Sequence, residues 1–225
     1  MSDYKGLRIA SALLIALLAI SCRQARAGAA GPFPNPAVDT PLAKAKAQET
    51  AVFSGGCFWG IQAVFQHVKG VISATSGYTG GEAVTAHYET VSGGNTGHAE
   101  SVSVVYDPSQ ITYGQLLKIF FSVAHDPTEV NRQGPDEGPQ YRSMISYSTD
   151  DQKRIAEAYI AQLNQAKIFS QPIATQVVHL KAFYPAEAYH QDYATKHPNE
   201  PYIYFNDAPK VARLEKQFPE LYVKK

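Results

Sequence analysis

The stretch VFSGGCFWG, residues 52–60, places one cysteine where a predicted strand meets a predicted helix. Upstream, the apolar segment TAVFSGG predicts a short strand that ends at two glycines. Downstream, FWGIQAVFQHV carries apolar residues three and four positions apart, which predicts a helix. We therefore expect Cys57 at the first turn of a helix. Gly55 and Gly56 would allow unusual backbone angles and the close approach of a ligand.

Cys57 has the neighbours of a reactive thiol. Free backbone N–H groups at a helix N-terminus favour a thiolate there. Phe58 and Trp59 would form an apolar wall beside the sulfur, and Gly60 keeps the next position uncrowded. The alternative is an ordinary buried cysteine on a core helix, because free cysteines are commonly buried.

Strands and helices alternate along the rest of the chain. Apolar patterning predicts further strands over residues 71–81, 98–108, 141–147 and 173–186. Helical spacing predicts helices over residues 112–124, 149–166 and, after an irregular tail from Pro198, 209–222. This order predicts an α+β fold: a two-layer sandwich of a mixed, mainly antiparallel sheet and packed helices, with a ferredoxin-like core and a long irregular C-terminal segment.

Glu100 is a candidate acid. In HAESVSVVYDP, residues 98–108, it shares the apolar face of the predicted strand with Val102 and Val104. A carboxyl group on such a face loses hydration, so its pKa rises and it can donate a proton near neutral pH. The alternative is a solvated carboxylate at the beginning of the strand, and the pattern alone does not separate the two.

The composition restricts the class of partner. The 225 residues are 44% hydrophobic and 18% charged, which suits a folded core. Twenty Lys and Arg residues balance twenty Asp and Glu residues, so the positive excess of a nucleic-acid binder is missing. No His/Cys pair has zinc spacing, so we expect no metal site. A small molecule or a protein surface is the expected partner.

Residues 1–27 have the order of a secretory signal peptide: Lys5 and Arg8, the apolar run IASALLIALLAIS, then small residues. The run is too short for a membrane-spanning helix. AISC resembles a bacterial lipobox, which would leave a lipidated Cys22 as the first residue, although Ala19 stands where leucine is expected. ARA before Gly28 is a plain cleavage site, and an uncleaved anchor is the third alternative. We expect an exported protein, either periplasmic or a membrane-anchored lipoprotein.

Residues 28–46 are rich in Ala, Gly and Pro without any period, which predicts a flexible tether. Residues 47–225 show no repeat and no second linker, so they form one catalytic domain. If Cys22 is lipidated or removed, Cys57 has no partner for an internal disulfide. The remaining thiol is then either buried and inert or reactive.

Several motifs together resemble the type A family of peptide methionine sulfoxide reductases. They are GGCFWG, GYTGG, GNTGHAESV, HDP, QYRS and YPAEAYHQDY. The resemblance runs from about Thr50 to Tyr222, and the pairing of GCFWG with GHAE is highly specific. Enzymes of this family return methionine sulfoxide to methionine.

The resemblance implies roles for seven residues. The catalytic ones are the nucleophile Cys57, the proton donor Glu100, the oxygen-binding Tyr88 and Tyr141, and the substrate-orienting Asp136. Phe58 and Trp59 would bind the methyl group of the sulfoxide. Composition alone could not have selected Tyr88 and Tyr141 from fourteen tyrosines.

The resemblance also implies the reaction. The S epimer of methionine sulfoxide, free or in proteins, would be reduced through a cysteine sulfenic acid, with no bound cofactor and by a monomer. Many family members carry further cysteines near the C-terminus, whereas no cysteine follows Cys57 here. Recycling would therefore depend on an external thiol, either a thioredoxin-like protein or a small dithiol.

Two other functions compete with this one. A cysteine hydrolase would use His98 or His190 as the base for Cys57. A non-catalytic, surface-anchored module would recognise oxidised proteins through the aromatic pocket and tolerate the loss of Cys57.

Overall fold

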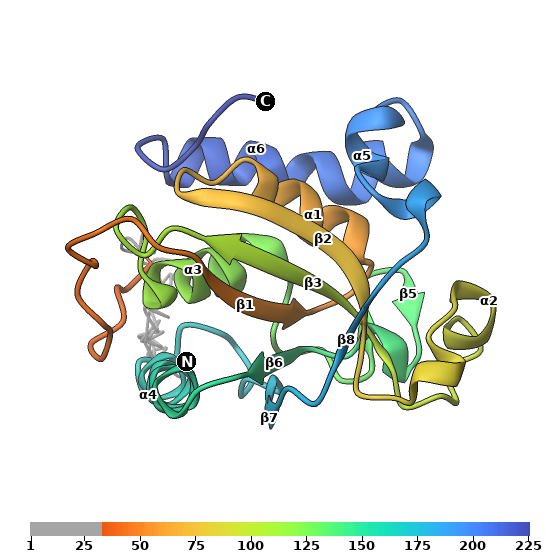
Figure 1. Ribbon diagram of the computed structural model, residues 1–225, viewed down its shortest axis with the longest axis horizontal. Helices are drawn as coiled ribbons and strands as arrows, with labels where there is room; N and C mark the ends of the chain where they lie inside the picture. Colours follow the sequence, from red (N-terminus) through yellow and green to blue (C-terminus); the bar gives the residue numbers. More distant parts are fainter. Residues whose placement is uncertain (1–32) are drawn as a thin grey trace, which may run out of the picture. The chain divides into compact units, whose positions relative to one another are not determined.

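A six-stranded sheet organises the chain in the computed structural model, which describes residues 33–225. The strand order is β7-β6-β1-β3-β2-β8 (Figure 1). Only β6 and β7 pair in parallel, and the other neighbours are antiparallel. The strands are β1 Glu49–Ser54, β2 Val71–Thr79, β3 Ala99–Tyr106, β6 Met144–Tyr147, β7 Gln176–His179 and β8 Phe183–Pro185, and a separate hairpin pairs β4 Arg132–Gln133 with β5 Asp136–Glu137. The predicted mixed, mainly antiparallel sheet is confirmed.

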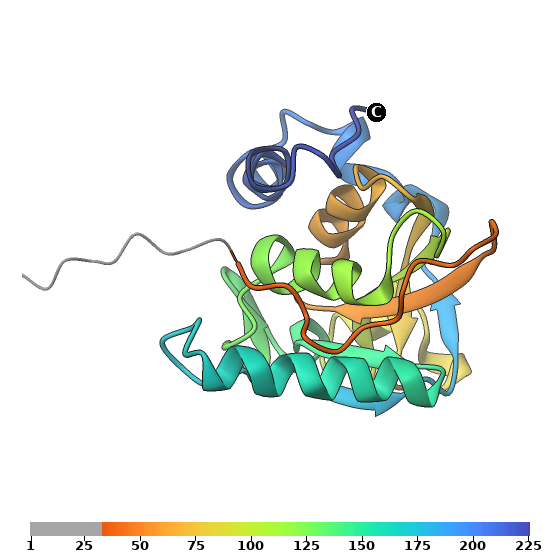
Figure 2. The same ribbon diagram turned by 90° about the vertical axis from the view of Figure 1, so that its left-hand side faces the viewer.

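Helices pack against this sheet and against one another, as the predicted α+β fold requires. The α-helices are α1 Phe58–Gln66, α2 Tyr88–Val91, α3 Tyr113–Ile119, α4 Asp150–Gln165, α5 Tyr193–Lys196 and α6 Ala208–Gln217. Short 3₁₀ turns are η1 Ala83–Thr85, η3 Pro139–Tyr141 and η4 Ala188–His190, and π-helical turns are η2 Phe120–Ala124 and η5 Ile203–Asp207. Seen from the side, α6, α1, α3 and α4 follow one another from top to bottom (Figure 2).

The core is built around Phe53 on β1. Its ring stacks on Phe65 of α1 at 5.1 Å and on Phe120 of η2 at 4.9 Å between ring centroids. All three side chains are fully buried. Burying each aromatic ring stabilises the fold by roughly 1.5–3 kcal/mol, so this stack fixes α1 firmly against the end of β1.

The register of β1 and β3 brings the predicted acid to the predicted thiol. Phe53 lies opposite Val102, and continuing this antiparallel register beyond β1 brings Glu100 level with Gly55. The chain then turns into α1 through Gly56, whose φ of 97° strongly favours glycine. The Gly56 N–H donates to the Tyr141 carbonyl at 3.1 Å, which ties η3 to the same turn.

One predicted strand is wrong. Residues 173–186 form two strands, β7 and β8, which pair at opposite edges of the sheet. Only three residues lie between His179 and Phe183, and the four steps from one Cα atom to the next reach about 14 Å at most. The two edges must therefore lie close together, so the sheet is strongly curled. In Figure 1 the chain rises from β7 directly into β8.

Part of the predicted tether belongs to the folded domain. Asp39 accepts hydrogen bonds from the Thr112 hydroxyl at 2.5 Å and from the Gly114 N–H at 3.0 Å. The Tyr159 hydroxyl donates to the Pro34 carbonyl at 2.6 Å. The segment 33–46 is therefore fixed against α3 and α4 by polar contacts that its composition did not reveal. The predicted signal peptide, Cys22 and the remainder of the tether lie outside the described residues.

The C-terminal segment is more regular than predicted. The helix expected over residues 209–222 is present as α6 but ends at Gln217, and the segment before it also folds, into α5 and the π-helical turn η5. In the part of the chain that the structure describes, no helix has the length and apolar character needed to span a membrane.

Candidate active site

A pocket of about 190 Å³ lies where β1 gives way to α1. All seven residues predicted for the site line it, together with one tyrosine that the sequence did not indicate. The lining residues are Cys57, Phe58, Trp59, Tyr88, Glu100, Asp136, Tyr141 and Tyr202. They come from α1, α2, β3, β5 and η3 and from the residue before η5, so the pocket depends on long-range packing.

Cys57 occupies the N-cap of α1, as predicted, but its thiol is not activated there. The residue is 8% exposed. Burial raises the pKa of the thiol well above its usual value, and the nearby carboxyl groups of Glu100 and Asp207 raise it further. A backbone N–H of Trp59 lowers this pKa, as expected at a helix N-terminus, but burial dominates. Burial therefore outweighs the helix N-terminus, and the thiol is favoured over the thiolate, contrary to the expectation from the sequence.

Glu100 is buried, which resolves the alternative that its sequence pattern left open. It is 2% exposed, and its Oε2 accepts the Phe58 N–H at 3.0 Å. The pKa of this carboxyl is raised to about 8, mainly by burial; the hydrogen bond from Phe58 lowers the pKa in part, and the charges of Asp136 and Asp207 raise it. Glu100 is therefore largely protonated at neutral pH and lies beside the Cys57 thiol.

Two phenol groups face the same space. Burial, followed by the charge of Glu100, raises the pKa of both the Tyr88 and the Tyr141 hydroxyl above the usual value. Both hydroxyls therefore keep their protons and can donate hydrogen bonds to an oxygen in the pocket.

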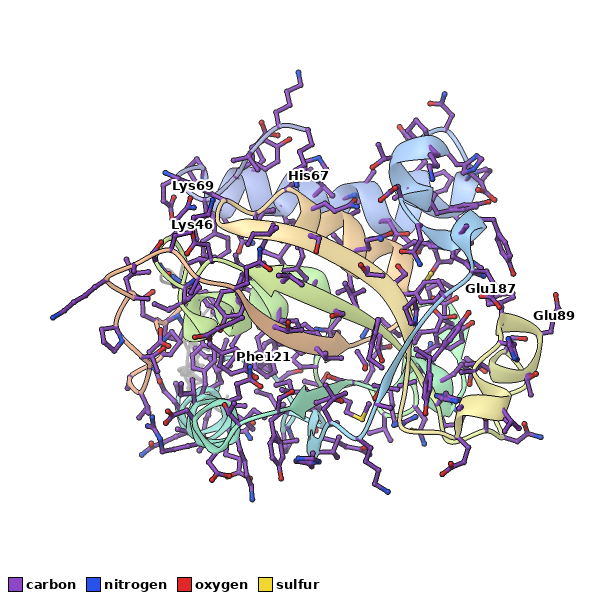
Figure 3. All side chains as sticks on the ribbon, viewed as in Figure 1. Lys46, His67, Lys69, Glu89, Phe121 and Glu187 are labelled. Atoms are coloured by element: carbon purple, nitrogen blue, oxygen red, sulfur yellow. The ribbon has the colours of Figure 1, made fainter. Side chains whose placement is uncertain are left out.

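Glu187 fixes the helix that carries Tyr88. One carboxylate oxygen accepts the Tyr88 N–H at 2.9 Å, and the other accepts the Tyr78 hydroxyl of β2 at 2.9 Å. Figure 3 shows Glu187 at the end of the β8 segment, next to α2, and Glu89 on the outer side of α2. Glu187 thereby joins α2 to the curled sheet and holds Tyr88 at the pocket.

Asp136 and Tyr202 form one polar wall. The Tyr202 hydroxyl donates to Asp136 Oδ2 at 2.5 Å, linking the β4–β5 hairpin to the C-terminal segment. Burial raises the pKa of Asp136, although the bond from Tyr202 and the charge of Lys210 lower it. Tyr202 was missed because it lies in a Pro/Tyr/Asn-rich segment that has neither period nor spacing to mark one tyrosine among fourteen.

The aromatic wall is held rigidly. Trp59 stacks on Tyr193 of α5 at 3.8 Å between ring centroids, and its indole N–H donates to His190 Nδ1 at 3.2 Å. Phe58 is fully buried and packs against Tyr78 at 5.8 Å. The pocket therefore offers a fixed apolar surface on one side and proton donors on the other.

The geometry gives no support to a hydrolase. His98 contacts backbone groups of Gly81 and Glu82, and His190 receives the Trp59 indole N–H. Neither histidine lines the pocket with the thiol. Within residues 33–225, no cluster of three His, Cys, Asp or Glu side chains could hold a metal ion.

The family model described as "Peptide methionine sulfoxide reductase" matches residues 49–222. The chain belongs to this family. Peptide methionine sulfoxide reductase MsrA 2 of Mesorhizobium japonicum is 60% identical over 181 residues, covering 80% of this chain and 93% of the relative. The MsrA 2 of Synechocystis sp. is 53% identical over 189 residues, covering 83% of this chain and 88% of the relative.

Solved structures agree with this assignment. The reduced form of Mxr1 from Saccharomyces cerevisiae matches the reductase with a TM-score of 0.61 at 32% identity, covering 72% of this chain and 91% of the other. Methionine sulfoxide reductase A of Corynebacterium diphtheriae matches with a TM-score of 0.60 at 33% identity, covering 73% of this chain and 86% of the other. The protein is an oxidoreductase that reduces methionine sulfoxide, and neither the hydrolase nor the non-catalytic module is favoured.

The burial of Glu100 predicts a pH-dependent stability. Below about pH 4.5 the carboxyl is protonated in the folded and the unfolded chain. Between that pH and about 8 the unfolded chain loses this proton while the folded reductase keeps it. Stability is therefore lost as pH rises, by several kcal/mol at roughly 1.4 kcal/mol for each pH unit. Glu100→Gln should remove this loss.

Urea unfolding of both proteins between pH 5 and 8 measures the effect. The free energy of unfolding of the variant, relative to that of the parent, should increase across this range. The exposed Glu157 of α4 provides the control, since Glu157→Gln should leave the parent's pH dependence unchanged. A constant difference between the Glu100 variant and the parent would contradict the raised pKa.

Proposed function

We propose that the reductase takes the S epimer of methionine sulfoxide, free or in proteins, and transfers its oxygen to Cys57. The observation that carries this proposal is the meeting of one thiol, one buried protonated carboxyl and two phenol hydroxyls in a single pocket. A sulfoxide sulfur accepts a nucleophile only when its oxygen is protonated or strongly hydrogen-bonded. Glu100, Tyr88 and Tyr141 supply donors where that charge develops.

In the first step the Cys57 sulfur attacks the sulfoxide sulfur while Glu100 protonates the oxygen. The S–O bond of the substrate breaks as the oxygen moves to the Cys57 sulfur, and the transient bond between the two sulfurs breaks with it, which releases methionine and leaves a Cys57 sulfenic acid. The thiol proton returns to Glu100. The sulfoxide is reduced, the cysteine is oxidised, and the number of protons in the pocket does not change.

The pocket walls support a choice between the two sulfur epimers. The methyl group would lie against Phe58 and Trp59, and the oxygen would face the three proton donors. Asp136, held by Tyr202, would orient the substrate backbone. Exchanging the positions of methyl and oxygen would place the oxygen on the apolar wall and leave the buried donors without a partner.

Recycling consumes two external thiol groups. No cysteine follows Cys57 in the sequence, so no second thiol from the C-terminal segment can reach the sulfenic acid. The first external thiol forms a mixed disulfide with Cys57 and releases water, and the second displaces Cys57 as a thiol. A thioredoxin-like protein or a small dithiol has this chemistry, and no bound cofactor is needed. We also propose a monomer, because one chain supplies every residue that lines the pocket.

Glu100→Gln should slow methionine formation by roughly 10²–10⁴-fold, because the amide keeps the shape of the side chain but supplies no transferable proton. The parent's single-turnover rate should also fall above about pH 8, where Glu100 ionises, and the variant should lack this fall. Stopped-flow measurement of released methionine between pH 6 and 10 tests both. If Glu100→Gln forms methionine as fast as the control variant Glu157→Gln, Glu100 is not the acid.

One turnover without reductant should release about one methionine per chain from the S epimer and almost none from the R epimer. The product should carry a sulfenic acid that dimedone traps, because no resolving thiol competes for it. Quantitative chromatography and mass spectrometry of the Cys22→Ser protein measure the stoichiometry and the adduct. Two methionines per chain, or equal use of both epimers, would refute the one-cysteine reaction.

We further propose export, either to the periplasm or as a lipoprotein anchored through Cys22. The proposal is supported by Lys5 and Arg8 before the apolar run and by the lipobox-like AISC. Mass spectrometry of protein from the native host should find an acylated Cys22 or an N-terminus near Gly28. A chain that still begins at Met1 would contradict both forms.

A further inference from the structure

A buried ion pair lies behind the first turn of α1 and does not line the pocket. Asp207, at the junction of η5 and α6, is fully buried, and Lys210 is 9% exposed. Lys210 Nζ donates to Asp207 Oδ1 at 3.0 Å, whereas Asp207 Oδ2 has no hydrogen-bond partner among the described residues. Two buried charges are often no better for stability than apolar side chains of similar size, so stability alone does not explain the pair.

The pair packs directly against Gly60. A β carbon at this position would collide with the Asp207 carboxylate and would lie 2.6 Å from Lys210 Nζ. Gly60 follows Cys57 by three residues, in the same first turn of α1. The second glycine of GCFWG therefore makes the space that the ion pair fills, and both charges lie against the turn that carries the thiol.

The π-helical turn η5 connects the pocket wall to the ion pair at Gly60. Tyr202, immediately before η5, forms part of the pocket wall and bonds to Asp136, and Asp207 ends η5 behind Gly60. Turns of this type are frequent at functional sites because they shift side chains out of helical register. Here the turn brings Tyr202 at its beginning to the pocket and Asp207 at its end to Gly60.

We propose that Asp207 and Lys210 are a positioning pair for Cys57. Lys210 supplies a cation packed against the turn that carries the sulfur, where negative charge develops during attack, and Asp207 holds Lys210 in place. The inference rests on the proposed role of Cys57 as the nucleophile.

Lys210 and Asp207 have opposite effects on the pKa of the Cys57 thiol. Burial, Glu100 and Asp207 raise the pKa of the thiol, whereas Lys210 lowers it. Asp207 also raises the pKa of Glu100. The titratable groups that neighbouring elements bring to this turn are Tyr88, Glu100, His125, Asp136, Tyr141, His190, Tyr193, Tyr202, Asp207 and Lys210. Among these side chains, Lys210 carries the ammonium group, which lowers the pKa of the Cys57 thiol.

The test measures the ionisation of Cys57 without using the sulfoxide. The full-length chain carrying Cys22→Ser has Cys57 as its single thiol. Iodoacetamide alkylation is followed from pH 6 to 11 in this parent and in Lys210→Met, Asp207→Asn and the double variant. Arg154→Met is the matched control, because it breaks an exposed ion pair with Asp151 on α4 at the same sequence spacing. Single-turnover methionine release is measured on the same proteins.

Lys210→Met should move the alkylation midpoint to higher pH by at least about one pH unit and slow methionine release at pH 7 by about tenfold or more. Asp207→Asn should move the midpoint to lower pH. The double variant should lie between the two, and Arg154→Met should match the parent. If Lys210→Met does not fold, the midpoints of Asp207→Asn and of the double variant decide.

Unchanged midpoints, or midpoints that move the same way when either charge is removed, would overturn the proposal and leave a purely structural pair. Opposite shifts support it even if no variant reduces methionine sulfoxide. In that case the proposed function would fail and the positioning pair would stand, so the two failures are distinguishable.

Discussion

The hydrogen bond from the Phe58 N–H to the Glu100 carboxyl is the contact on which the site depends. A carboxyl group buried on β3 needs a polar partner, and the first turn of α1 has backbone N–H groups without partners in the helix. Each satisfies the other at 3.0 Å. The bond also fixes α1 against β3 with Cys57 at its N-cap, so one interaction sets both the position of the thiol and the proximity of the acid.

This contact requires the topology around it. β1 must pair with β3 in the register that puts Phe53 opposite Val102, or Glu100 would not reach the beginning of α1. The curl of the sheet matters equally, because it brings β8 and the following segment to the same region. Glu187 can then hold α2 with Tyr88, and His190 can receive the indole N–H of Trp59. The pocket is thus a consequence of one register and one curl.

Local patterns in the sequence predicted the central elements, because α4 buries one regular face and because β1, α1 and β3 are rich in apolar residues. They could not decide the burial of Glu100, since both faces of β3 are buried at its beginning: Ala99 and Ser101 are as inaccessible as Val102. An alternating pattern carries no information where there is no exposed face. The motifs, through a family resemblance, were needed to select the residues that line the pocket.

The features that sequence reasoning missed all arise from long-range packing of irregular segments. Asp39 lies in a proline-rich stretch that looks like a tether, yet its carboxylate accepts hydrogen bonds at the beginning of α3. Tyr202 and Asp207 lie at the two ends of a π-helical turn that follows no simple period, and Lys210 follows on α6. Their positions depend on Gly60 and on the β4–β5 hairpin, which are far away in the sequence. No local pattern could predict such contacts.

The raised pKa values of Cys57 and Glu100 have one physical origin and suit the proposed reaction. Two acids in one water-poor pocket cannot both ionise cheaply, because each negative charge raises the pKa of the other group. An ionised Glu100 would raise the pKa of the thiol further, and it would have no proton to give to the oxygen. Oxygen transfer from sulfoxide to thiol begins and ends with the same number of protons. The pocket can therefore remain neutral while the thiol proton passes through Glu100 to the oxygen, and burial, which works against a resting thiolate, keeps that proton available.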